Sequence, residues 1–294
     1  MSNSKQIIIV PTDFSDNALI ALHEAIDFSE TFPSEIILFH SVETYLLNTV
    51  LRKTIGFNKE RNASLLEAVD IELGDLAKTV GNERNITIKT YIATGKVYSE
   101  LGKYASKIKA DFIVMGTHGA TGLEKLMLGT NATRVAATAP CPVITIREKS
   151  KNRGVGTIVL PLDLTKETRQ KVNRVIELAK KFKATIHVIS IQNTTDEFLV
   201  NSLKRQLNQV KAFIAKENIK VVAELIMVNE KISDAVLDYA EKVEAGLIVI
   251  MSQSESGISD WVLGTSAENV IKSSHIPVLT ITPVEIGKAV FNPY

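Results

Sequence analysis

Residues 7–15 read Ile-Ile-Ile-Val-Pro-Thr-Asp-Phe-Ser, and residues 157–165 read Thr-Ile-Val-Leu-Pro-Leu-Asp-Leu-Thr, 150 positions further along the chain. A second match, at a shift of 135 positions, sets Ala-Asp-Phe-Ile-Val-Met at 110–115 against Ala-Gly-Leu-Ile-Val-Ile at 245–250. Two separate matches of this kind predict a tandem duplication of one unit of about 140 residues, which is an ordinary domain size.

Glycines distinguish the two copies. The dipeptide Gly-Thr at 129–130 recurs at 264–265, so this part of the pattern is present in both copies. Two upstream glycines are replaced in the second copy, Gly116 by Met251 and Gly119 by Ser254. We therefore predict that the first copy binds a phosphate-bearing ligand and that the second copy has lost this ability.

Composition narrows the function classes. The 294 residues carry 34 basic and 33 acidic side chains, without the basic excess that is typical of a nucleic-acid-binding protein. No apolar run approaches the ~20 residues that cross a bilayer, so no membrane association is expected. The first five residues lead directly into a predicted strand, which leaves no room for a signal peptide and favours a cytoplasmic protein. The single cysteine excludes an internal disulfide.

Short runs rich in Ile and Val alternate with helical patterns. The runs are apolar at consecutive positions, as in strands that are covered on both faces of a parallel sheet, and they fall at 7–10, 35–39, 86–92, 112–115 and 143–146. Apolar stripes with helical spacing lie between them, around Leu22, Leu73 and Leu101. The alternation predicts an α/β chain with two tandem, doubly wound parallel sheets of the Rossmann-like type.

The domain organisation follows from the repeat. We expect a first domain at 1–148, a polar, glycine-bearing linker at 149–156, a second domain at 157–283 and a C-terminal tail at 284–294. Residues 43–59 have no counterpart of similar length in the second copy. This insertion is apolar enough to form a short helix or a flap.

The most informative motif follows the predicted strand at 112–115. It reads Gly116-Thr117-His118-Gly119, then nine residues, then Gly129-Thr130-Asn131, just before a helix expected at 132–139. Glycines at a strand end let backbone N–H groups approach phosphate oxygens, and a helix N-terminus adds unpaired donors. Thr130 could donate a hydroxyl and also cap the helix. The alternative is that Gly129 only serves a turn, because Gly264 persists in the second copy.

A second group of candidates ends the first strand. Pro11-Thr12-Asp13 should lie at the same crevice, where Asp13 could accept a hydrogen bond from a base amine or a ribose hydroxyl. The alternative is that Asp13 and Ser15 cap the following helix, since Asp163 and Thr165 recur in the second copy. Val42, just after the second strand, could pack on a planar ring.

Other reactive side chains do not form a catalytic pattern. The histidines have no metal-ligand spacing, so we expect no metal held by protein groups alone, although Mg²⁺ or Mn²⁺ could arrive on phosphates. Cys141 lies between two prolines before an apolar strand and is interpreted as a buried thiol. The Gly-x-x-x-x-Gly-Lys loop of fast nucleotide hydrolases is absent, so any hydrolysis should be slow.

These residues resemble a known family. Val-Pro-Thr-Asp-Phe-Ser at 10–15, Val-Met-Gly-Thr-His-Gly at 114–119, Gly-Thr-Asn-Ala at 129–132 and Ala-Pro-Cys-Pro-Val at 139–143 resemble the universal stress protein family. The resemblance covers both halves. In the first half the glycine spacing is similar to that of the family's nucleotide-binding branch, and the second half resembles the branch that does not bind ATP.

The resemblance implies a five-stranded sheet of order 3-2-1-4-5 and an adenine-nucleotide site for ATP. It places the base and ribose near Pro11, Thr12, Asp13 and Val42, and the phosphates near Gly116, His118, Gly119, Gly129, Thr130 and Asn131, with Met115 and Ala132 beside them. It also implies pairing through the last strands, so that 142–146 and 277–281 form a pseudo-dimer within one chain, with a homodimer also possible.

Three functions remain open from the sequence. The first is an ATP-binding stress-response protein that is not an enzyme. The second is an adaptor that works through its surfaces without nucleotide, which the degenerate second motif favours. The third is a slow ATPase or a nucleotidyl-transferring enzyme, against which the missing lysine argues.

Overall fold

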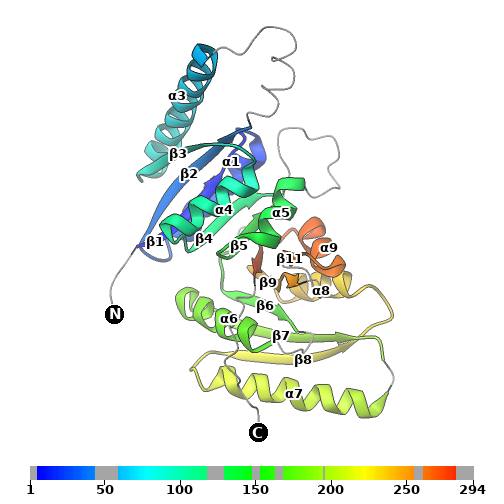
Figure 1. Cartoon of the computed structure of the whole chain (residues 1–294). Coiled ribbons are helices and arrows are strands. Elements are labelled where there is room, and N and C mark those ends of the chain that lie inside the picture. Colours follow the sequence, from blue (N-terminus) through cyan, green and yellow to red (C-terminus); the bar gives the residue numbers. More distant parts are fainter. Residues whose placement is uncertain are drawn as a thin grey trace, which may run out of the picture.

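The computed structural model of the chain describes residues 5–43, 59–117, 129–147, 153–162, 168–194, 196–254 and 261–282 (Figure 1). Its centre is a ten-stranded sheet of order β3-β2-β1-β4-β5-β12-β9-β6-β7-β8. The first half supplies β1 (Gln6–Pro11), β2 (Ser34–Val42), β3 (Ile88–Thr94), β4 (Phe112–Gly116) and β5 (Val143–Ile146). The second half supplies β6 (Thr157–Pro161), β7 (Thr185–Gln192), β8 (Val221–Met227), β9 (Leu247–Met251) and β12 (Val278–Ile281).

Within each half the strands are parallel and have the order 3-2-1-4-5 that was expected. The expected pairing of the last strands, 142–146 with 277–281, is confirmed, because β5 and β12 join the two five-stranded halves into one sheet. Their pairing is antiparallel, with Ile144 opposite Leu279. The hydroxyl of Thr145 also donates to the carbonyl of Val278 at 3.2 Å. A short antiparallel pair, β10 (Gln253–Ser254) and β11 (Trp261–Val262), lies outside this sheet.

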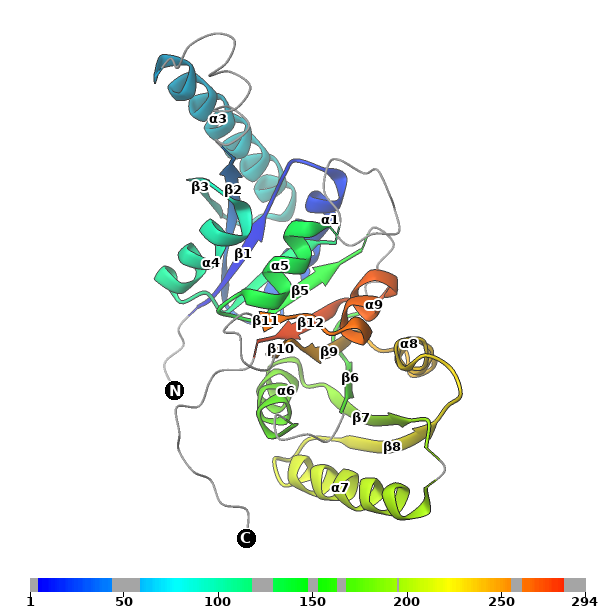
Figure 2. The same cartoon turned by 45° about the vertical axis from the view of Figure 1, so that its right-hand side comes forward.

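Helices cover both faces of the sheet (Figures 1 and 2). One face carries α1 (Asp16–Ser29), α3 (Lys59–Arg84), α6 (Thr168–Phe182) and α7 (Glu197–Ala215). The other carries α4 (Val97–Ile108), α5 (Thr130–Thr138), α8 (Ile232–Lys242) and α9 (Thr265–Ser273). Each of the two cores therefore contains side chains from both halves.

The central strand β1 shows why its apolar residues are consecutive. Ile8 and Val10 belong to the core under α1, whereas Ile9 belongs to the core under α4, and all three are at most 1% exposed. Successive side chains of a strand point to opposite faces, so a strand that is covered on both faces needs apolar residues throughout. The helical stripes behave as predicted, with Leu22, Leu73 and Leu101 all fully buried.

Aromatic side chains pack the two halves together beside the seam. The ring of Phe182, at the end of α6, lies 6.2 Å from that of Phe28 and 5.6 Å from that of Phe32 in the first half. The ammonium group of Lys181 lies 5.7 Å from the ring centre of Phe112 and donates to the side chain of Gln6 at 2.6 Å. The seam is thus reinforced by side-chain packing as well as by backbone hydrogen bonds.

The described part of the expected linker packs closely against the second half. Arg153 forms an ion pair with Glu241 of α8 at 2.9 Å, and Val155 is buried. A Cβ on Gly246 would stand 1.7 Å from the carbonyl oxygen of Gly154, so the chain can pass here only with glycine at 246. Residues 153–156 are therefore part of the second half's packing rather than a loose connection.

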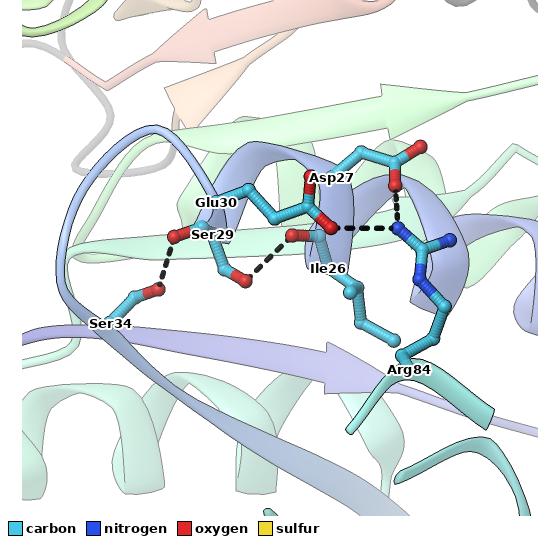
Figure 3. Close-up of polar contacts among 6 residues, drawn as sticks. All are labelled: Ile26, Asp27, Ser29, Glu30, Ser34 and Arg84. Carbon is cyan, nitrogen blue, oxygen red and sulfur yellow. Dashed lines mark hydrogen bonds and ion pairs between the residues drawn. The ribbon is translucent and has the colours of Figure 1, made fainter. Parts of the chain in front are cut away.

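The C-terminal end of α3 is fixed to α1 by charged side chains (Figure 3). The guanidinium of Arg84 forms ion pairs with Asp27 and, at 3.1 Å, with Glu30. Beside them, the hydroxyl of Ser29 donates to the carbonyl of Ile26 at 2.6 Å, and that of Ser34 donates to the carbonyl of Ser29. These contacts set the position of α3 above the sheet.

Glu24 on α1 generates a pH-dependent prediction. Burial, with a smaller contribution from Asp27, raises the pKa of this half-buried carboxyl from 4.5 to about 7. Because the folded-state pKa lies above the unfolded value, Glu24 favours folding fully below pH 4.5, and this contribution is lost as the pH rises through 7. We expect Glu24→Gln to raise the free energy of unfolding at pH 8 by on the order of 1 kcal/mol, after allowance for solvent screening.

Urea unfolding across this pH range checks the prediction, with Glu67→Gln on the exposed face of α3 as the matched control. The stabilisation by Glu24→Gln should shrink to nothing at low pH. An equal difference between variant and wild type at every pH would contradict the assignment.

Candidate functional site

A cavity of about 610 Å³ opens at the carboxyl ends of the first half's strands. Its walls come from the ends of β1, β2 and β4, from the starts of α4 and α5, and from α3. This is where an open, doubly wound sheet offers a ligand site. Ten of the predicted site residues line this cavity: Pro11, Thr12, Asp13, Val42, Met115, Gly116, Gly129, Thr130, Asn131 and Ala132. The other two, His118 and Gly119, lie outside the described residues.

The loop after β1 is held by its own side chains. Phe14 has a positive φ of 63°, and the hydroxyl of Thr12 accepts from its N–H at 3.0 Å. Ser15 is the N-cap of α1 and accepts from the N–H of Ala18. One carboxylate oxygen of Asp13 accepts from the N–H and the hydroxyl of Ser15. Asp13 therefore supports the helix cap and also lines the cavity, whereas its hydrogen bond to a ligand stays a prediction.

The start of α5 differs from the sequence prediction. Gly129 is the N-cap residue, and Thr130 is the first residue of the helix, so the prediction that Thr130 caps it is wrong. Because Gly129 is a glycine, the N-cap residue supplies no side-chain cap to this helix start. The N–H of Gly129 bonds to the carbonyl of Thr117 at 2.9 Å, which ties the helix start to the end of β4. The uncapped first turn presents backbone N–H donors and the positive end of the helix dipole at the cavity wall.

Gly116 has a packing role that the comparison of the two copies did not predict. A Cβ at this position would stand 3.0 Å from the carbonyl oxygen of Asn17 in α1, closer than most such contacts. In the second half Met251 occupies the same register, opposite Ile281, and the strand continues. A side chain at position 116 would therefore require the backbone of Asn17 to shift by a few tenths of an ångström.

Several lining residues were not predicted from the sequence. Nδ1 of His40 lies 2.8 Å from the carbonyl oxygen of Thr12, and its ring is 5.0 Å from that of Phe14. Ser41 donates to the carbonyl of Gly95 at 2.9 Å, which fixes the neighbouring loop. The remaining additions are mainly apolar: Ala18, Phe39, Glu43, Leu65, Val69, Val97 and Thr117.

The contribution of α3 could be anticipated only in part. Val69 lies four residues before Leu73, so it shares the face of the apolar stripe that was expected around Leu73. The apolar stripe does not predict whether Val69 and Leu65 cover the sheet or a cavity. The answer depends on how far α3 extends past the ends of the strands.

The second half keeps the helix start but changes the strand ends. α9 has Gly264 as its N-cap, again with no side-chain cap. The register of the strands places Ser190 where the first half has His40, and Gln192 where it has Val42. Met251 in place of Gly116 is a third such difference between the halves.

Metal and membrane features were sought in the part of the chain that the structure describes. Within it, no three side chains of His, Cys, Asp or Glu gather in a way that could hold a metal ion. The described helices include none with the length and apolar character needed to cross a bilayer. Cys141 is 8% exposed and burial raises its pKa to about 12, so its interpretation as a buried thiol is confirmed.

The fold places the chain among Rossmann-like α/β proteins, and a cavity lies at the strand ends of its first half. The model of the universal stress protein family matches residues 5–147 and, a second time, residues 154–282. The chain belongs to the universal stress protein family and contains two tandem copies of its domain.

Relatives agree with this assignment. Universal stress protein MJ0531 of Methanocaldococcus jannaschii is 34% identical over 148 residues, which are 49% of this chain and 83% of that protein. Universal stress protein MJ0577 of the same organism is 28% identical over 162 residues, 51% of this chain and 99% of its own length. A crystal structure of a universal stress protein from Archaeoglobus fulgidus has a TM-score of 0.72 at 20% identity, covers 96% of this chain and 98% of its own, and shares its fold.

The packing of Gly116 gives a prediction about stability. We expect Gly116→Ala to lower the free energy of unfolding by about 1 kcal/mol, because the new methyl group must displace the backbone of Asn17. Gly102→Ala in α4 is the matched control, since nothing lies within 4 Å of a Cβ there. That control should be neutral or stabilising, as alanine favours a helix interior. Equal denaturation midpoints for Gly116→Ala and wild type would contradict the packing role.

Proposed function

We propose that the first half binds an adenine nucleotide, ATP, in the cavity at its strand ends, and that the protein acts in stress response or regulation. The observation that carries this proposal is the uncapped start of α5, whose first residues line the cavity. Backbone N–H groups at a helix N-terminus form a ready anion site, which suits a chain of phosphates. The cavity volume of about 610 Å³ lies within the ordinary range for small-molecule sites.

The lining separates into a polar and an apolar part. Residues 129–131 would face the phosphates, and a divalent ion carried on these phosphates would supply charge neutralisation. Val42, Val69 and Val97 offer apolar surface for a flat base. Asp13, at the end of β1, is placed to accept from a ribose hydroxyl.

We infer a binding protein rather than an enzyme. The described lining contains no lysine or arginine that could stabilise charge developing on a transferred phosphate. The Nδ1 atom of His40 lies within hydrogen-bonding distance of the carbonyl oxygen of Thr12, so this nitrogen is poorly placed to act as a general base. Any hydrolysis should be slower than the turnover of about 1 per second that marks the low end of typical enzymes.

The second half is proposed as a structural partner. Met251 and Ser190 change its strand ends, whereas the uncapped start of α9 is retained. The alternative is an adaptor that works without nucleotide. The replacements in the second half favour this alternative only if the cavity of the first half also fails to bind ATP.

A pair of matched variants tests the proposal. Thr130→Asp places a carboxylate in the first turn of α5, where an acid stabilises the helix but repels a phosphate. We expect it to weaken binding of Mg-ATP by at least about tenfold, because like charges in a shared site cost a kcal/mol or more. Thr265→Asp makes the same change at the start of α9 and should leave binding unaltered.

Calorimetry with Mg-ATP and thermal unfolding provide the readouts. ATP at ~100 times its dissociation constant should stabilise the wild type by about 2.7 kcal/mol. Absence of binding by the wild type, or a loss confined to Thr265→Asp, would refute the proposal.

A further inference from the structure

A second groove lies between α1 and α3, beside the cavity at the strand ends, and Thr12 lines both. It has a volume of about 500 Å³, and its apolar surface comes from Phe14 and Leu19 on one side and from Leu76 on the other. Ile71 stands at its edge with 60% of its surface exposed. A large aliphatic side chain exposed to this degree beside an apolar groove is typical of an interaction surface.

The charged side chains that line this groove are all negative. Asp16, Glu72 and Asp75 line it, and no lysine, arginine or histidine is part of the described lining. The wider surface of α3 agrees, because residues 64–84 contain five carboxylates against two basic side chains. A partner for this groove therefore needs apolar side chains flanked by positive charge.

The opposite end of the same molecule presents that combination. Together with its cap residues, α7 (196–216) contains four basic and two acidic residues, the acidic ones at its N-terminal end, and Phe198 in its first turn is 78% exposed. Arg205 follows Phe198 by seven residues, and Lys216, which caps the helix, follows Arg205 by eleven. At 3.6 residues per turn these three side chains share one face of the helix. Phe213 adds further exposed apolar surface near its end, with 39% exposed.

The two surfaces cannot meet within one molecule. α3 lies at one end of the structure and α7 at the other in both views (Figures 1 and 2). The strands β5 and β12, which join the halves, are already paired with each other. Any contact between α7 and the groove is therefore a contact between copies.

We propose that the basic outer face of α7 of one copy docks into the acidic α1–α3 groove of a second copy. Phe198 fills the apolar floor, and Arg205 faces Glu72 and Asp75. Two copies that exchange this contact reciprocally form a closed dimer, whereas one-way contacts form an open chain. The proposal does not rest on nucleotide binding, since Glu72, Asp75 and α7 do not line the cavity at the strand ends, although Thr12 lines both the groove and the cavity.

Charge reversal on each surface tests the proposal by sedimentation. One variant carries Glu72→Lys and Asp75→Lys, and the other carries Arg205→Glu and Lys216→Glu. Each alone should weaken self-association at least about tenfold, because like charges then face each other. An equimolar mixture should associate again, since each reversed groove meets a reversed helix. Asp238→Lys on α8 is the matched control and should behave as wild type.

The outcomes separate clearly. Association of the wild type should weaken between about 20 mM and 500 mM salt, as expected for exposed ion pairs. A wild type that stays monomeric at all concentrations would overturn the proposal, and so would reversals that leave association unchanged. Circular dichroism checks that both variants are folded. If the folded variants fail to associate when they are mixed, the proposal is also overturned.

Discussion

The antiparallel pairing of β5 with β12 is the constraint on which the rest of the structure depends. It turns two parallel five-stranded sheets into one sheet, so neither last strand remains as an open edge. It also sets the direction of the two halves. β12 runs antiparallel to β5. The strands of the two halves therefore point in opposite directions, and their carboxyl ends lie at opposite ends of the strands of the joined sheet. The cavity of the first half therefore cannot merge with the corresponding region of the second.

The proposed difference in function between the two halves rests on a few residues. Both α5 and α9 begin after a glycine with no side-chain cap, so the anion-favouring helix start is common to both. The strand ends differ, with Met251 in the register of Gly116 and Ser190 in that of His40. We therefore propose that the two halves differ in function because of the side chains at their strand ends. The two cores, which contain residues from both halves, preserve the fold.

Much of the fold could be predicted from local pattern, because the repeat, the strand runs and the helical stripes are all encoded by neighbouring residues. The gathering of Thr12, Val42 and Asn131 in one cavity followed from the rule that parallel strands bind ligands at their carboxyl ends. What could not be predicted depends on contacts between distant segments. The closeness of Gly116 to Asn17 and of Gly246 to Gly154, and the reach of α3 over the strand ends, arise only when the chain is packed.

The location of a bound triphosphate tests the central claim most directly. A crystal structure of the full chain grown with Mg-ATP should show the phosphates against the first turn of α5, with Asp13 and Val42 toward the nucleoside. Triphosphate density at the start of α9, with the first half's cavity empty, would contradict the account.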